Sequence, residues 1–113
     1  MKPGIITELP GPKSQELLKL KEQYVVRGYG NACSMFADRA EGALVQDLDG
    51  NVFVDFAGGI GILNAGHCPP EVVEVLKSQI DRYLHTGHIF LMEPLVRLAE
   101  RLAQIAPGDF AKK

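Results

Sequence analysis

Apolar side chains recur three and four residues apart in two stretches of the second half of the chain. This spacing places them on one side of an α-helix, so residues 71–84 and 92–106 are each predicted to form an amphipathic helix. The inward side of the second helix is expected to carry Leu95, Leu98, Ala99, Leu102 and Ile105. A less regular helix is expected over residues 15–26, with Ser14 as its N-cap, because a serine hydroxyl can accept a free N–H of the first turn.

A strand pattern surrounds Asp49-Gly50 in ALVQDLDGNVFVDF, residues 43–56. Asp-Gly is favoured in two-residue hairpin turns, and pairing outward from that turn sets Val45 opposite Val54. Residues that oppose one another share a face of the sheet. The face predicted to be buried therefore carries Ala43, Val45, Val52, Val54 and Phe56. The preceding stretch, 27–42, contains the chain breakers Gly28 and Gly30, and no element is assigned to it.

Two segments of the chain lack a periodic pattern. Residues 1–13 hold three prolines and two glycines and are expected to form an irregular N-terminal arm. The segment DFAGGIGILNAGHCPPEVVEVL, residues 55–76, places four glycines within nine positions. Such backbone is typical of a tight turn, a close approach of another backbone, or a ligand.

Composition narrows the class of protein without naming a reaction. The 113 residues are 46% hydrophobic and 23% charged, with a net charge of −2, which suits one globular domain and does not favour a nucleic-acid partner. Cys33 and Cys68 are too few for a disulfide framework, so reduced thiols and a cytoplasmic location are expected. No apolar run approaches the length needed to span a bilayer, and no membrane partner is expected.

The candidate chemistry is sparse. Four side chains could hold zinc, namely His67, Cys68, His85 and His88, but no C-x-x-C pair accompanies them. The simpler interpretation is that His67 helps to cap a helix and that the other two histidines line a loop. No phosphate-binding loop, nucleophile elbow or other complete catalytic set is present, and no metal site is assigned. The expected fold is an α+β fragment with an N-terminal helix, a β-hairpin and two further helices, whose wide apolar faces suggest a piece of a larger assembly.

One long run has a recognisable family character. FADRAEGALVQDLDGNVFVDFAGGIGILNAGHCPPEVVEVL, residues 36–76, resembles the N-terminal part of class III aminotransferases, which depend on pyridoxal phosphate. HTGH at 85–88 belongs to the same resemblance, and PGDFAKK at 107–113 is similar to the 4-aminobutyrate aminotransferases within that class. The resemblance covers about Gln15 to Lys113, which is nearly the whole chain.

The resemblance implies a place in a larger enzyme. Residues 1–13 would be an arm, and 14–113 would be part of the small domain of a fold-type I transferase and the start of the connection to its large domain. The phosphate loop and the Schiff-base lysine of the family lie further along the chain. Lys112 and Lys113 do not match that lysine, so no catalytic or cofactor-binding residue is assigned. The chain alone is expected neither to bind pyridoxal phosphate nor to be active.

The resemblance also implies a reaction, a partner and one site residue. The parent enzyme would move an amino group from an ω-amino acid such as 4-aminobutyrate to a 2-oxo acid such as 2-oxoglutarate, as a homodimer. Ile60 matches a family position that contributes to the substrate pocket, although an ordinary core role is the alternative. The segment HTGHIF differs in length from the family, so no role is assigned to His88 or Ile89. The competing interpretation of the chain is a freestanding α+β protein-interaction module without catalysis.

Overall fold

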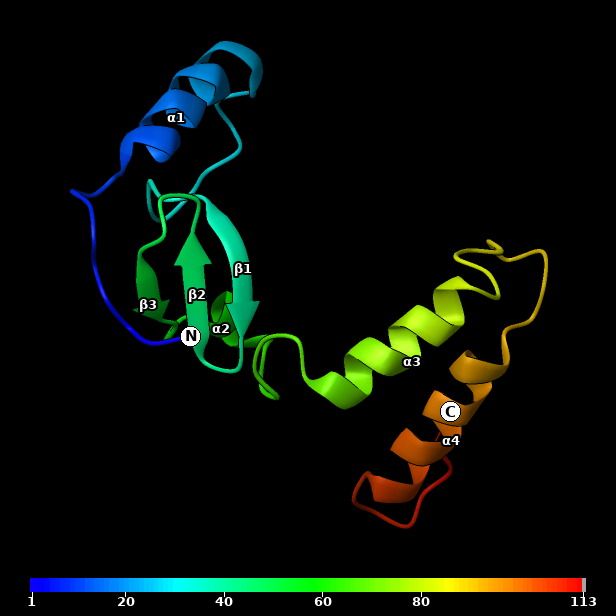
Figure 1. The fold of residues 1–113 in the computed structure, drawn as a ribbon. Helices are drawn as coiled ribbons and strands as arrows, with labels where there is room; N and C mark the ends of the chain where they lie inside the picture. Colours follow the sequence, from blue (N-terminus) through cyan, green and yellow to red (C-terminus); the bar gives the residue numbers. More distant parts are fainter. Residues whose placement is uncertain (113) are drawn as a thin grey trace. The chain divides into compact units, whose positions relative to one another are not determined.

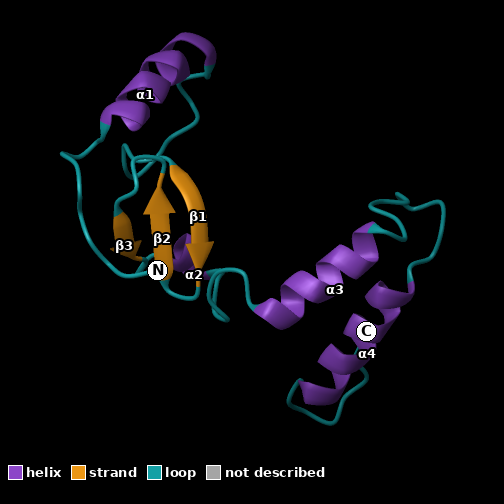
Figure 2. Cartoon of the chain, viewed as in Figure 1, coloured by secondary structure: helices purple, strands orange, loops and turns teal. Residues whose placement is uncertain are grey.

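The computed structural model describes residues 1–112, which form two units. The first unit is Met1–Val75, and the second begins at Leu76. The elements in chain order are α1 (Pro12–Tyr24), β1 (Ala37–Glu41), β2 (Leu44–Asp47), β3 (Val52–Val54), α2 (Gly58–Gly61), α3 (Pro70–Ile80) and α4 (Glu93–Ile105). Figure 2 shows the strands, which all belong to the first unit, in orange and the helices in purple. The α+β class expected from the sequence is confirmed.

The sheet has three antiparallel strands in the order β1-β2-β3. β1 was not expected from the sequence, and it pairs with β2 through Ala40 opposite Val45 and Glu41 opposite Leu44. Its sequence, ADRAE, has little intrinsic strand preference because alanine and acidic residues are depleted in strands. Pairing with β2 makes it a strand, and its charged side chains suit the edge of a sheet.

The β2–β3 hairpin differs by one residue from the predicted register. Leu44 lies opposite Val54 and Val45 lies opposite Phe53. The N–H of Asp47 donates to the carbonyl of Asn51 at 2.9 Å, so the loop holds three residues, and Gly50 within it has a φ of 90°. A three-residue loop with glycine in the left-handed region is a common alternative to the two-residue turn. A shift of one residue exchanges the two faces of a strand, so the predicted buried face is wrong.

The hairpin loop is held by polar side chains. Asn51 is fully buried and Asp47 is 2% exposed. Asp47 Oδ1 accepts the N–H groups of Asp49 at 3.0 Å and Asn51 at 2.8 Å, while Asp47 Oδ2 accepts Asn51 Nδ2 at 2.8 Å. These bonds hold the loop in one conformation, since both carboxylate oxygens of the buried Asp47 have partners.

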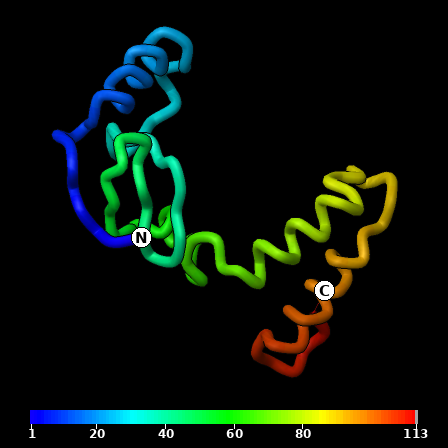
Figure 3. Tube along the Cα trace, in the orientation of Figure 1, coloured from blue at the N-terminus to red at the C-terminus, as the bar shows by residue number. Residues whose placement is uncertain are grey.

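The N-terminal arm lies along this hairpin, as the blue trace in Figure 3 shows. Gly4 and Val52 exchange two backbone hydrogen bonds, of 3.0 and 2.8 Å. Further along, Asn51 Oδ1 accepts the N–H groups of Ile6 at 2.8 Å and Thr7 at 3.0 Å. The arm is therefore irregular in conformation but is tied to the sheet at several points.

The first turn of α1 is capped by a side chain that lies far away in the sequence. The helix begins at Pro12, so Ser14 lies inside its first turn and is not the N-cap that the sequence suggested. Asp49 accepts the N–H of Lys13 at 2.8 Å, the N–H of Ser14 at 3.0 Å and the Ser14 hydroxyl at 2.7 Å. The carboxylate of the hairpin loop thus takes the place of a local cap. Gly11 permits this approach, because a Cβ there would lie 2.4 Å from Asp49 Cγ.

The two longer helices of the second half agree with the apolar spacing. α4 lies within one residue of its predicted limits, whereas α3 ends at Ile80, four residues early. The end of α3 is marked by the side chain of Gln79, which donates to the carbonyl of Tyr83 at 3.1 Å. The side chains expected to face inward from α4 remain about half exposed, with Leu102 at 51% and Ile105 at 59%. In the part of the chain that the structure describes, no hydrophobic side chain is fully buried.

Candidate functional site

The glycine-rich segment forms a left-handed turn. φ is 51° at Gly58, 62° at Gly59, 62° at Ile60 and 82° at Gly61, a run that defines α2. The carbonyl of Gly58 accepts the N–H groups of Ile62 at 3.0 Å and Leu63 at 2.9 Å, which closes the turn. Glycine adopts this backbone freely, so three glycines in four residues explain why the sequence can form it.

Ile60 is the exception within that turn. A β-branched residue in the left-handed region is an outlier, because its Cβ crowds the following carbonyl at a cost of about 1–2 kcal/mol. Its side chain is 95% exposed, so packing within residues 1–112 does almost nothing to offset the strain. Residues kept in such conformations cluster at binding and catalytic sites. Ile60, the one site residue taken from the sequence, therefore lies at the most strained position of the turn.

A side-chain pair joins the two ends of the glycine-rich segment. Nε2 of His67 lies 2.7 Å from Oδ2 of Asp55, and the two side chains are only 20% and 15% exposed. The hydrogen bond from His67 contributes most to lowering the pKa of Asp55. The N–H groups of Gly58 and Ala57 lower this pKa further, while partial desolvation acts to raise it. A charged carboxylate only accepts hydrogen bonds, so His67 Nε2 carries the proton and donates it.

The pair is anchored at both residues. Oδ1 of Asp55 accepts the N–H groups of Ala57 at 2.9 Å and Gly58 at 3.0 Å, where the left-handed turn begins. The backbone of His67 exchanges two hydrogen bonds with Gly42, of 2.8 and 2.9 Å, at the β1–β2 turn. The interpretation of His67 as a helix cap is therefore wrong. In the sequence, Asp55 and His67 stand just before and just after the stretch that holds the four glycines, which was the one available signal for this pair.

A cavity of about 360 Å³ lies beside the pair. Its lining includes Ala43, Asp55, Leu63, Asn64 and His67. Gly66 is needed at its edge, because a Cβ there would lie 3.0 Å from the carbonyl oxygen of Gly42. The cavity combines a charged carboxylate, a histidine and apolar carbons, a mixture that suits a small polar ligand better than a purely apolar one.

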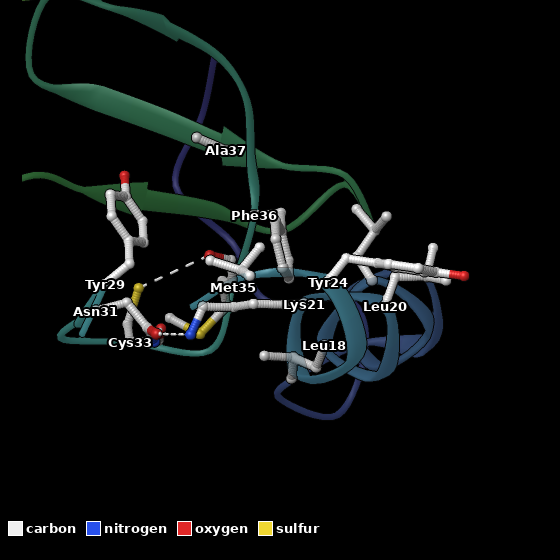
Figure 4. Close-up of a pocket in the computed structure, with 12 residues that line it drawn as sticks. Leu18, Leu20, Lys21, Tyr24, Tyr29, Asn31, Cys33, Met35, Phe36 and Ala37 are labelled. Atoms are coloured by element: carbon white, nitrogen blue, oxygen red, sulfur yellow. Dashed lines mark hydrogen bonds between the residues drawn. The ribbon is translucent and has the colours of Figure 1, made fainter. Parts of the chain in front are cut away.

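A second cavity, of about 510 Å³, lies between α1 and the loop that leads to β1 (Figure 4). Its walls are mainly apolar and aromatic and include Leu18, Tyr24, Tyr29 and Phe36. Lys21 Nζ donates to Asn31 Oδ1 at 2.6 Å across one side. The lining residues include no histidine or carboxylate, and the mainly apolar walls make this cavity a packing surface.

The candidate zinc ligands are not brought together as a site. Across residues 1–112 no group of three or more His, Cys, Asp or Glu side chains is arranged to hold a metal ion. His67 is engaged by Asp55, while Cys68 and Cys33 are both exposed free thiols. His85 and His88 belong to the second unit. Nor does the described part of the chain contain a helix both long and apolar enough to cross a membrane.

The cavity beside Asp55 and His67 does not by itself meet the needs of pyridoxal phosphate. That cofactor needs a lysine for covalent attachment and a partner for its ring nitrogen. The described lining of the cavity beside Asp55 and His67 includes no lysine. Lys112 is engaged elsewhere, because its Nζ donates to the carbonyls of Ala103 and Ala106 at the end of α4. Lys113 lies outside the described residues.

Known proteins resemble this chain over most of its length. It is 43% identical over 101 residues to the 4-aminobutyrate aminotransferase of Escherichia coli K12, and 41% identical over 101 residues to a 5-aminovalerate aminotransferase of Pseudomonas aeruginosa. Each alignment covers 88% of this chain and 24% of the relative. The chain thus spans about a quarter of the length of these relatives.

Solved structures show the same fold. The acetylornithine aminotransferase of Elizabethkingia anophelis superposes with a TM-score of 0.74 at 26% identity, over 81% of this chain and 24% of that protein. The ornithine δ-aminotransferase of Plasmodium falciparum superposes with a TM-score of 0.73 at 21% identity, over the same shares, which shows the fold alone.

The match at the level of the family is equally broad. Residues 24–112 match the family model described as Aminotransferase class-III. This range includes the sheet, the left-handed turn with Ile60 and the Asp55–His67 pair. The resemblance noted in the sequence is confirmed, and the chain belongs to the class III aminotransferases, a family that depends on pyridoxal phosphate.

Proposed function

We propose that this chain forms the N-terminal part of an aminotransferase subunit that takes an amino group from an ω-amino acid, 4-aminobutyrate, and gives it to a 2-oxo acid such as 2-oxoglutarate. The support for the donor is that relatives 43% and 36% identical, from E. coli and Mycobacterium leprae, are named 4-aminobutyrate aminotransferases. The residues before α1 serve as an arm, and α1 and the residues after it serve as a small-domain segment and the start of the connection to the large domain.

The observation that carries this proposal is the lack of a buried apolar core among residues 1–112. Large side chains are open to solvent in both units, including Phe56 at 96%, Leu84 at 80% and Leu91 at 97%. An independently stable domain buries most of its large apolar side chains in a core. These side chains are buried by the rest of the subunit and by a second subunit of a homodimer. The free thiols of Cys33 and Cys68 agree with a cytoplasmic enzyme.

In the complete subunit, Ile60 lines the substrate pocket. Its exposed side chain offers an apolar contact for the methylene carbons of an ω-amino acid, and the flanking glycines let a ligand approach the backbone closely. The chain contributes substrate binding and orientation. Attachment of the cofactor and proton transfer belong to residues outside this chain, so the chain alone is inactive.

A hybrid subunit tests this function. The chain replaces the matching segment of the E. coli relative, and the purified hybrid is assayed for transfer from 4-aminobutyrate to 2-oxoglutarate. We expect activity in the hybrid, and none in the 113-residue chain mixed with pyridoxal phosphate. A hybrid that folds and binds cofactor but does not transaminate would contradict the proposal, as would lysine-bound cofactor in stoichiometric amount on the chain alone.

The role of Ile60 is tested in the same hybrid. Ile60→Ala removes apolar contact with the donor, and we expect the KM for 4-aminobutyrate to rise about tenfold with a smaller change in kcat. Ile62→Ala is the matched control, because Ile62 is 78% exposed two residues away and has an ordinary right-handed backbone. Equal kinetics in wild type and Ile60→Ala would show that Ile60 does not line the pocket.

A further inference from the structure

Residues 57–66, the part of the glycine-rich segment that holds its four glycines, are held at both borders by one pair of side chains. Asp55 stands directly after β3 and accepts the first two N–H groups of the segment, from Ala57 and Gly58. His67 stands at the far border, where its backbone is paired with Gly42. The 2.7 Å contact between His67 Nε2 and Asp55 Oδ2 closes the loop across these borders. A loop of this kind keeps its conformation only as long as both borders stay in place.

The residues of the turn inside this loop do not by themselves favour its left-handed backbone conformation. Ile60 resists the left-handed backbone, and its side chain is 95% exposed, so it contributes no packing that would hold the turn. Three glycines permit the conformation, but they permit many others equally well. Backbone bonds accepted by Ala57 and Gly58 close the turn once it has formed, but they do not fix the backbone where it starts. In the structure, the group outside the turn that accepts its first N–H, that of Gly58, is Oδ1 of Asp55.

We propose that Asp55 and His67 are positioning residues that hold the left-handed turn at Gly58–Gly61 so that Ile60 points into the donor pocket. Asp55 fixes the first N–H groups of the turn, and His67 fixes the orientation of the Asp55 carboxylate through its second oxygen. Neither residue needs to touch the substrate. The proposal rests on the pocket role of Ile60 proposed above.

The test uses the hybrid subunit with cofactor bound and compares variants that break or keep the side-chain contact. His67→Phe keeps the ring volume but removes the donor, and Asp55→Ala removes all three acceptor contacts. His67→Gln keeps an N–H donor at about the reach of Nε2. Asp38→Ala, at an exposed carboxylate on β1, is the matched control for Asp55→Ala.

Two readouts separate positioning from a general structural role. Hydrogen exchange of the peptide 56–66, read by mass spectrometry, reports the turn, and the peptide 43–47 in β2 reports the sheet. We expect His67→Phe and Asp55→Ala to speed exchange in 56–66 about tenfold or more, with 43–47 unchanged. We also expect the KM for 4-aminobutyrate to rise about fivefold with a smaller change in kcat. His67→Gln should restore both values, and Asp38→Ala should change neither.

The outcomes distinguish this proposal from the one on which it rests. Unchanged exchange in 56–66 for both breaking variants overturns the positioning role, while an active wild-type hybrid still supports the aminotransferase function. Faster exchange without any change in KM also overturns it, since the turn would then not serve the pocket. If Asp55→Ala fails to accumulate as folded protein, His67→Phe carries the test, because it leaves the bonds from Asp55 to Ala57 and Gly58 in place.

Discussion

At the residue scale, the strained backbone of Ile60 links stability to substrate binding. The side chain is 95% exposed, so its removal costs no packing within the chain. Ile60→Gly relieves the left-handed strain, and we expect the hybrid subunit to gain about 1 kcal/mol in the free energy of unfolding. The same change removes the apolar contact with the donor, so the KM for 4-aminobutyrate should rise. Thermal unfolding and steady-state kinetics on one preparation check both effects, and a less stable Ile60→Gly variant would contradict the strain.

Asn51 is a second residue whose effect can be stated in advance. It is fully buried, accepts the N–H groups of Ile6 and Thr7, and donates to Asp47 and to the Thr7 hydroxyl. Asn51→Ala leaves several of these groups without a partner, and we expect a loss of about 3 kcal/mol in unfolding free energy. Asn31→Ala, at an exposed position, is the control and should cost far less. Equal losses in urea unfolding of the two variants would contradict the role assigned to Asn51.

At the scale of elements, the N-terminus of α1 depends on a carboxylate from the hairpin loop. Partial desolvation acts to raise the pKa of Asp49, but the Ser14 hydroxyl, the N–H groups of Lys13 and Ser14 and the charge of Lys13 lower it overall. The folded pKa is therefore below the unfolded value of about 3.9. This stabilisation is complete above the unfolded pKa and disappears as the pH falls through the folded pKa.

The pH dependence gives a direct test of that cap. Asp49→Asn should lower the unfolding midpoint at pH 7, and the difference from wild type should shrink as the pH approaches 3 and below. Urea unfolding of the hybrid subunit across this range measures it, with Asp38→Asn as the exposed control. Asp55 also has a lowered pKa, so the comparison of variants, and not the wild-type curve alone, isolates Asp49. A difference that stays constant with pH would show that the charge of Asp49 does not cap α1.

At the scale of the whole molecule, the described chain presents apolar surface in place of a core. We expect the 113-residue chain alone to unfold without a cooperative transition and to bind a hydrophobic dye, because burial of apolar surface supplies most of the cooperativity of folding. The hybrid subunit should unfold cooperatively and bind little dye. Circular dichroism and dye fluorescence measure both. A sharp transition of the chain alone would favour the freestanding interaction module instead.

How well each element was predicted depends on how far apart in the sequence its stabilising contacts lie. The apolar spacing predicted α4 to within one residue, because helical periodicity depends on neighbours three and four positions apart. The register of the hairpin was predicted wrongly by one residue, since Gly50 adopts a φ of 90° in a three-residue loop that the Asp-Gly pair alone does not specify. The strand β1 escaped prediction because it depends on pairing with β2, and its own residues favour no strand.

The sequence by itself determined the limits of α4, the presence of α1 and α3 and, through its motifs, membership of the aminotransferase family. Only the tertiary structure decided which carboxylate caps α1 and which side chain His67 meets. Asp49 reaches Ser14 across 35 positions of sequence, and His67 reaches Asp55 across 12. Local patterns record preferences of nearby residues, whereas these contacts exist only after the hairpin has brought distant backbone together, so no spacing rule along the chain could specify them.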